Sequence, residues 1–185
     1  MNSAERTTIV FKHLQKTSIH AGLLDGFAHR QEITKKWVKQ DEVWTLADAF
    51  LLREWSDEKR VWITEYMCEQ IDRGGVAVGA FSDDRIIGFC CVDGVVSGSS
   101  AKYVNLTMLF VDDCWKRHGI GRTLFRKAQE HARRLGAEKI FISAIPSAET
   151  VAFYQKMGCI DAAEIVERFV DAEDDRYLEC GVVSI

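Results

Sequence analysis

The chain has 185 residues, 47% of them hydrophobic, and a formal net charge of -4 from 24 lysines and arginines against 28 aspartates and glutamates. This length and apolar content predict one domain, residues 1–185, with a buried core of its own. The acidic balance, without any long block of like charge, argues against nucleic acid as a partner.

The N-terminus MNSAERTTIVFKHLQ lacks the apolar centre of a signal peptide, and no later stretch resembles a membrane span. We therefore expect a cytoplasmic protein without a membrane partner. Six cysteines show neither CxxC pairing nor clustering with histidine, which predicts reduced thiols and no metal site. Cys90 and Cys91 are interpreted as small buried residues, and a nucleophilic role for Cys114 or Cys159 would lack a partner histidine.

The first part of the chain is predicted to be mainly helical. A short strand is expected at 8–12, and the pattern over 17–73 is interpreted as two helices. Ser56 is the expected N-cap of the last helical segment, which Gly74 and Gly75 should end.

The second part alternates between strands and helices. Residues 75–81 and 85–92 predict a hairpin, and the apolar run 103–111 predicts a central strand. A helix at 119–135 and a strand at 139–145 should follow. Together, the strand at 103–111, the helix and the next strand form a right-handed crossover that makes the two strands parallel neighbours.

The C-terminal part is predicted to add a helix at 148–157, after Pro146 and Ser147, and strands around 160–168 and 176–184. The expected fold class is therefore α/β, with a single mixed, mostly antiparallel sheet flanked by helices. Ligands in such folds bind where a strand turns into the following helix.

One such corner carries the sequence KRHGIG at 116–121. The first amides of a helix have no internal partner, so the corner attracts anions. Glycines at 119 and 121 allow a phosphate to approach the backbone, while Lys116, Arg117 and Arg122 add positive charge. The pattern predicts a ligand with a diphosphate.

Four interpretations of this corner compete. A P-loop fails because its GxxxxGK[ST] spacing is absent. A Rossmann corner would need a small residue at Leu124 and an acid at the end of the next strand, where Glu138 instead lies at the beginning. Coenzyme A is the third candidate, and a purely structural turn is the fourth.

The surrounding sequence resembles the GNAT superfamily of acyl-CoA N-acyltransferases over residues 75–160. The family signature is Gln or Arg, two residues, Gly, one residue, then Gly or Ala, and it matches here from Lys116 to Gly121, with Lys at the first position. The segment AFYQKMG at 152–158 resembles a second family motif. The resemblance implies an acyl-CoA N-acyltransferase fold whose parallel strand–helix–strand unit binds acetyl-CoA.

In that family the strand before the signature separates from the next strand, and the pantetheine arm bonds to it. Ser147 takes the position of a family asparagine near the coenzyme. The resemblance thus implies a coenzyme site formed by Leu109, Phe110, Val111, Lys116, Arg117, His118, Gly119, Ile120, Gly121, Arg122 and Ser147. Since family members are often dimers, a homodimer is among the expected assemblies.

Tyr154 matches the tyrosine that family members use as general acid toward the thioester sulfur. The resemblance supplies no base, because Asn105 stands where relatives carry a glutamate. Proton removal is therefore expected from solvent or from an acid of the N-terminal segment.

That segment holds aromatic and acidic residues that suit a cationic amine, or that instead pack the helices and face solvent. They are Trp37, Trp44, Trp55, Trp62, Asp41, Glu42, Asp48, Glu54, Asp57 and Glu58.

These observations predict acetyl transfer from acetyl-CoA to a primary amine, of a small molecule rather than of a protein. The amine would attack directly within a ternary complex, because no cysteine with an activating partner is evident. The alternatives are a protein N-acetyltransferase, a non-catalytic acyl-CoA-binding or regulatory module, and a protein that binds another diphosphate nucleotide.

Overall fold

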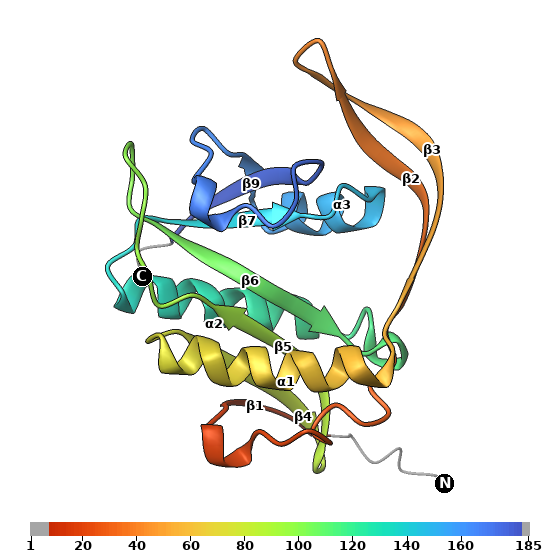
Figure 1. Ribbon diagram of the computed structural model, residues 1–185, viewed down its shortest axis with the longest axis vertical. Helices are drawn as coiled ribbons and strands as arrows, with labels where there is room; N and C mark the ends of the chain where they lie inside the picture. Colours follow the sequence, from red (N-terminus) through yellow and green to blue (C-terminus); the bar gives the residue numbers. More distant parts are fainter. Residues whose placement is uncertain (1–7, 183–185) are drawn as a thin grey trace, which may run out of the picture.

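The computed structural model describes residues 8–182, and its centre is a sheet with the strand order β1-β4-β5-β6-β7-β9-β8 (Figure 1). Its strands are β1 (Ile9–His13), β4 (Val76–Ser82), β5 (Arg85–Val92), β6 (Tyr103–Val111), β7 (Lys139–Ala144), β8 (Ile160–Asp161) and β9 (Arg176–Gly181). Among the described strands, β6 and β7 form the one parallel pair. The mixed, mostly antiparallel sheet is thus confirmed.

Three helices flank the sheet (Figure 1). They are α1 (Asp57–Asp72), α2 (Ile120–Arg134) and α3 (Ala148–Lys156), with short 3-10 turns η1 (Lys16–Ser18), η2 (Asp113–Trp115) and η3 (Glu167–Phe169). Ser56 caps α1 as expected, because its Oγ accepts a hydrogen bond from the Lys59 amide at 3.2 Å. No helix between residues 8 and 182 is long and apolar enough to cross a membrane.

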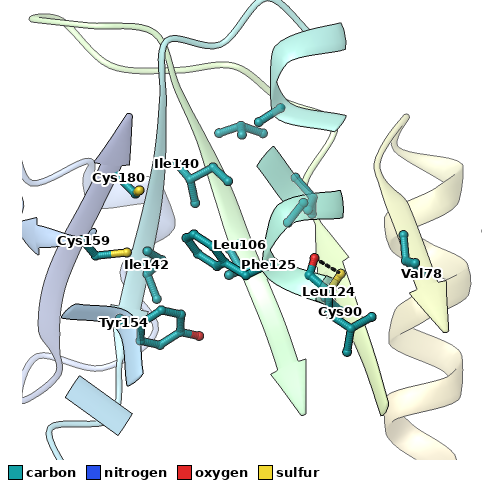
Figure 2. Close-up of a cluster of buried hydrophobic side chains, with 14 of the residues drawn as sticks. Val78, Cys90, Leu106, Leu124, Phe125, Ile140, Ile142, Tyr154, Cys159 and Cys180 are labelled. Atoms are coloured by element: carbon teal, nitrogen blue, oxygen red, sulfur yellow. Dashed lines mark hydrogen bonds between the residues drawn. The ribbon is translucent and has the colours of Figure 1, made fainter. Parts of the chain in front are cut away.

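The core lies on both faces of the sheet. On one face, α2 and Tyr154 of α3 pack against the sheet, with Leu124, Phe125 and Ile140 at the centre (Figure 2). On the other face, α1 contributes Ile63 and Met67 to a second cluster. A third cluster fixes the loop around η3 to β6 and β7, through Tyr103, Phe141, Val166 and Phe169. Helix α1 and the η3 loop therefore cover neighbouring parts of one face.

The helical prediction for 17–73 is wrong over most of its length. Helix α1 is the one α-helix there, and it is preceded by a long hairpin of β2 (Arg30–Gln40) and β3 (Val43–Glu54). The hairpin extends away from the body of the protein at its tip (Figure 1).

The hairpin lacks the sequence pattern by which a strand is usually recognised. Both strands contain β-branched and aromatic residues, which favour strands, but most hairpin residues are exposed, so no apolar face alternates with a polar one. The two-residue loop Asp41–Glu42 has positive φ angles of 47° and 63°, as a type I′ turn requires. Such turns usually contain Asn-Gly or Asp-Gly, and this loop has neither.

The two C-terminal strands are shorter than predicted. The expected strand at 160–168 is a strand only over Ile160–Asp161, and the chain then forms an irregular loop through η3. The last expected strand, 176–184, is observed as β9, while residues 183–184 lie outside the described part. The loop at 162–175 matters for function because it covers the sheet beside β6 and β7.

Candidate active site

The parallel strands β6 and β7 pair only at their beginnings. Their register runs from Tyr103–Lys139 to Asn105–Phe141, and beyond this point β7 pairs with β9 alone. The separation of the two arrows is visible in Figure 1. A gap therefore opens between the later halves of the two strands, as the resemblance implied for the strand before the signature.

A bulge in β6 accompanies this separation. Cys91 pairs with Met108 while the next residue of β5 pairs with Leu106, so Thr107 is the extra residue. Bulges bend a strand and increase its twist. The bend turns the second half of β6 away from β7.

Backbone groups of β6 face this gap at alternate residues. The Asp112 amide donates to the Ile87 carbonyl at 3.0 Å. Because backbone groups in an antiparallel pair alternate in direction, Phe110 bonds toward β5 while Leu109 and Val111 direct their amides and carbonyls into the gap. Two of the three residues expected to bond the pantetheine are thus oriented for it.

The gap belongs to a cavity of about 1110 Å³. Its lining contains Tyr154 and all the predicted coenzyme residues except His118. The His118 ring instead folds back on its own turn, where Nδ1 lies 2.9 Å from the Lys116 carbonyl. The structure therefore brings the remaining predicted residues together around one space.

The N-terminus of α2 opens into this cavity. Gly119 is the N-cap, with a left-handed φ of 79°, and the Thr123 amide donates to its carbonyl at 3.1 Å. The amides before Thr123 have no carbonyl one turn earlier to bond. Arg117 and Arg122 are exposed beside them, and Lys116 forms an ion pair with Asp113. The helix amides without a partner and the two exposed guanidinium groups together suit a phosphate group.

Gly121 keeps this corner open. A Cβ added at Gly121 would lie 3.2 Å from the Phe153 ring and 3.6 Å from a Val111 methyl group. A side chain at this position would therefore crowd the entrance between the helix terminus and β6.

Tyr154 lies on α3 and its ring packs against Phe125 of α2, with centroids 6.0 Å apart (Figure 2). The side chain is 7% exposed and lines the cavity. Burial, with smaller contributions from Cys159 and Cys90, raises the pKa of its phenol well above the usual value. The phenol is therefore protonated at neutral pH, as a general acid must be.

Ser147 is fully buried at the start of α3. Its Oγ caps the helix by accepting from the Thr150 amide at 3.1 Å, and it also accepts from Nε2 of Gln31 at 3.0 Å. The same hydroxyl donates to Thr150 Oγ1 at 2.9 Å, so it already makes three hydrogen bonds, one of which joins α3 to β2.

None of the six cysteines, all within the described residues, lines the cavity. Cys90 and Cys91 are buried as predicted. Burial raises the pKa of Cys90 to about 12, and its Sγ lies 3.5 Å from the Leu124 carbonyl (Figure 2). The geometry offers no cysteine nucleophile to the cavity.

The tryptophans of the N-terminal segment contact cations of the chain itself. Trp37 and Trp44 enclose the Arg176 guanidinium, at 4.9 and 4.8 Å from their ring centroids, and Lys59 lies 3.6 Å from Trp62. Trp55 instead stacks on a core phenylalanine. The predicted acids between 41 and 58 lie outside the cavity lining.

Sequence reasoning missed two groups in the lining. One is His29, just before β2, and the other is formed by Asp171, Asp174 and Asp175 in the loop after η3. Neither lies in a recognisable motif. His29 reaches the cavity from the segment that is wrongly predicted to be helical, and the three aspartates reach it through packing of the loop after η3.

His29 is held by the two aspartates that follow β6. The Ala28 amide donates to Asp112 Oδ2 at 3.0 Å, and the Arg30 amide donates to Asp113 Oδ2 at 2.7 Å. The His29 ring packs against Trp55, with centroids 4.5 Å apart. Burial lowers the pKa of His29 to about 4, so the imidazole is neutral at pH 7.

Comparison with known proteins agrees with this geometry. The profile of the acetyltransferase (GNAT) family matches residues 33–159, more than half of the chain. The chain therefore belongs to the GNAT acetyltransferase family. Comparison with curated protein sequences finds no match.

Solved structures of similar fold include other acetyltransferases. A putative streptothricin acetyltransferase from Bacillus anthracis, in complex with acetyl coenzyme A, has a TM-score of 0.63 at 16% identity over 94% of this chain and 99% of its own. Nourseothricin acetyltransferase has a TM-score of 0.62 at 17% identity, with coverages of 92% and 95%. PaiA N-acetyltransferase from Thermoplasma acidophilum, in complex with coenzyme A, has a TM-score of 0.60 at 15% identity, with coverages of 94% and 99%.

Proposed function

We propose that this protein transfers an acetyl group from acetyl-CoA to a primary amine of a small cationic molecule. The observation that carries the proposal is the single cavity into which the β6–β7 gap, the α2 N-terminus and Tyr154 all open. The pyrophosphate would bind the α2 amides, and the pantetheine arm would bond to Leu109 and Val111. The coenzyme residues would thus be those predicted, except His118, which lies outside the lining, and Phe110, whose backbone bonds toward β5.

The same cavity supports direct transfer in a ternary complex. Tyr154 would protonate the departing sulfur, and a backbone amide of β6 that faces the gap would polarise the thioester carbonyl. A covalent cysteine intermediate receives no support, because no cysteine lines the cavity.

The acceptor side supports a small cationic substrate. The loop after η3 contributes carboxylates to the lining, and Trp62 and Tyr66 of α1 contribute aromatic rings. The hairpin also crosses the open end of the gap, since the Trp37 amide donates to the Pro146 carbonyl at 2.7 Å. This crossing restricts access by a folded protein.

An acceptor panel tests the proposal. Purified protein would be incubated with acetyl-CoA and 1,6-diaminohexane, kanamycin, streptothricin or a peptide with an N-terminal alanine, and the products would be identified by mass spectrometry. We expect acetylation of at least one small amine and not of the peptide. Acetylation of the peptide alone would replace the acceptor class by proteins, and binding of acetyl-CoA without any transfer would favour a non-catalytic module.

A further inference from the structure

The acceptor face of the gap is bordered by α1 on one side and by the η3 loop on the other. Met108 and Phe110 of β6 pack with the cluster beneath α1, whereas Phe141 of β7 packs with the cluster beneath the η3 loop. Tyr154 contacts the core on the opposite, α2 face. An amine that attacks the thioester from the face opposite Tyr154 would therefore enter between α1 and this loop.

Asp171 is fixed at this border. Its amide donates to Ser143 Oγ at 3.1 Å, and Ser143 Oγ donates to Asp175 Oδ2 at 2.7 Å. Ser143 lies on β7, two residues beyond Phe141, where pairing with β6 ends. These two hydrogen bonds attach the η3 loop to β7 next to the point where the gap between β6 and β7 begins.

The Asp171 carboxylate is available for a ligand. It is exposed, lines the cavity, and receives no hydrogen bond from any residue in the described part of the chain. Across the acceptor face, Tyr66 of α1 lines the same cavity. Burial, with a smaller contribution from the charge of Asp171, raises the pKa of the Tyr66 phenol. Asp171 and Tyr66 therefore border the cavity from the η3 loop and from α1.

We propose that Asp171 is the general base of the transfer, with Tyr66 on the opposite side of the acceptor amine. This inference rests on the proposed function. Although the Asp171 side chain is exposed at the border of the cavity, partial burial of its carboxyl group, with a smaller contribution from the charge of Asp175, raises its pKa and makes the carboxylate more basic than one in water.

Other candidates fit this role less well. Asn105, at the position of the family glutamate, is 5% exposed, lies outside the cavity lining and has no carboxylate. His29 lies toward the other end of β6, near Asp113 and Lys116, and its low pKa makes it a weaker base.

Each turnover moves two protons from the acceptor nitrogen and one proton to the sulfur. Asp171 removes one proton from the ammonium group of the acceptor, and the neutral nitrogen forms a bond to the thioester carbon. When the C–S bond breaks, the sulfur receives a proton from Tyr154, and the nitrogen loses its second excess proton to water. Tyr154 regains a proton from solvent and Asp171 releases one, so each turnover yields an amide, free coenzyme A and one proton.

The test is the substitution Asp171→Asn, which removes the base without changing size. The probe is 1,6-diaminohexane, or whichever amine of the panel the wild type acetylates fastest. We expect kcat at pH 7 to fall about 10²- to 10⁴-fold, with unchanged acetyl-CoA affinity by calorimetry. Glu173→Gln is the matched control, because Glu173 belongs to the same loop but lies outside the lining; it should retain wild-type kcat.

A pH profile separates a base from a structural residue. In Asp171→Asn the acidic limb of the kcat/KM profile should move from the pKa of Asp171 to the higher pKa of the free amine, so that rate returns only as the amine deprotonates in solution, whereas Asp171→Glu should keep the original limb. The groups that face Asp171 are Tyr66 from α1 and Asp175 from its own loop, with Arg53 of β3 acting on Asp175.

The outcomes distinguish the two proposals. An Asp171→Asn variant with wild-type kcat and pH profile would overturn the role of Asp171 while leaving the acetyltransferase function intact. A wild-type protein that acetylates no amine of the panel would overturn the function, and the role of Asp171 with it.

Discussion

The two sides of the cavity are built in different ways. The coenzyme side uses backbone groups of one continuous unit, β6 with α2, held by a buried core on the α2 face. The acceptor side uses side chains from α1, the β2–β3 hairpin and the η3 loop, which are far apart in the sequence. Substitutions on the acceptor side should therefore alter the kinetics with the acceptor amine while leaving the affinity for acetyl-CoA unchanged. Single substitutions on each side can test this independence.

The largest effect is expected at Tyr154, where the two sides meet in the chemical step. Tyr154→Phe removes the proposed proton donor to sulfur but keeps the ring packed on Phe125. Steady-state kinetics should give a kcat about 10²- to 10⁴-fold lower, with acetyl-CoA affinity unchanged by calorimetry. Unaltered turnover would remove Tyr154 from the mechanism.

Gly121→Leu should break the coenzyme side alone. The new side chain would crowd Phe153 and block the helix amides that we propose bind phosphate. Loss of two charge-assisted hydrogen bonds, at about 1.5 kcal/mol each, weakens acetyl-CoA binding about 100-fold. Gly181→Leu is the control, because a Cβ there meets nothing within 4 Å. Equal affinity in both variants would contradict the phosphate corner.

His29, which lies just before β2, provides a pH-dependent test of stability. Its pKa is about 4 in the folded protein against an ordinary value of 6.5, so between these values the unfolded chain binds more protons. The free energy of unfolding should therefore fall as pH drops below 6.5, by at most about 1.4 kcal/mol per pH unit from this residue. Denaturant unfolding of His29→Asn should show a shallower loss. An identical slope in the variant would mean that His29 is not the titrating group.

The smallest effect is expected where the hairpin docks on the body. Trp44→Ala removes one of the two rings that enclose Arg176 and should cost about 1–2 kcal/mol of stability. We expect a raised KM for the acceptor and unchanged acetyl-CoA affinity. Phe50→Ala is the control, because Phe50 is 92% exposed on the same hairpin. Loss of acetyl-CoA affinity in Trp44→Ala would show that the two sides are coupled.

The residues of the proposed coenzyme side could be predicted from the sequence, whereas those of the proposed acceptor side could not. The corner at Gly119 and Gly121 was predicted because it repeats a local spacing, and Tyr154 because it lies in a short contiguous motif. The strand–helix–strand unit was also predicted closely, since its elements are buried on regular stripes.

The acceptor side could not be predicted in this way. The exposed hairpin lacks an apolar stripe, and its turn at Asp41–Glu42 lacks the usual residues. Asp171 reaches the gap only because Ser143 and the cluster around Phe141 fix an irregular loop over the sheet. Contacts between distant segments leave no local pattern, so this side required the structure.

The most direct test of the coenzyme site is calorimetric titration of acetyl-CoA into the purified protein, with NAD as the comparison ligand. We expect saturable binding of acetyl-CoA and none of NAD, because the corner at Gly119 and Gly121 continues into the gap between β6 and β7, which we propose holds the pantetheine arm. Binding of NAD, or no binding of acetyl-CoA, would contradict the assignment of this cavity to an acyl-coenzyme A.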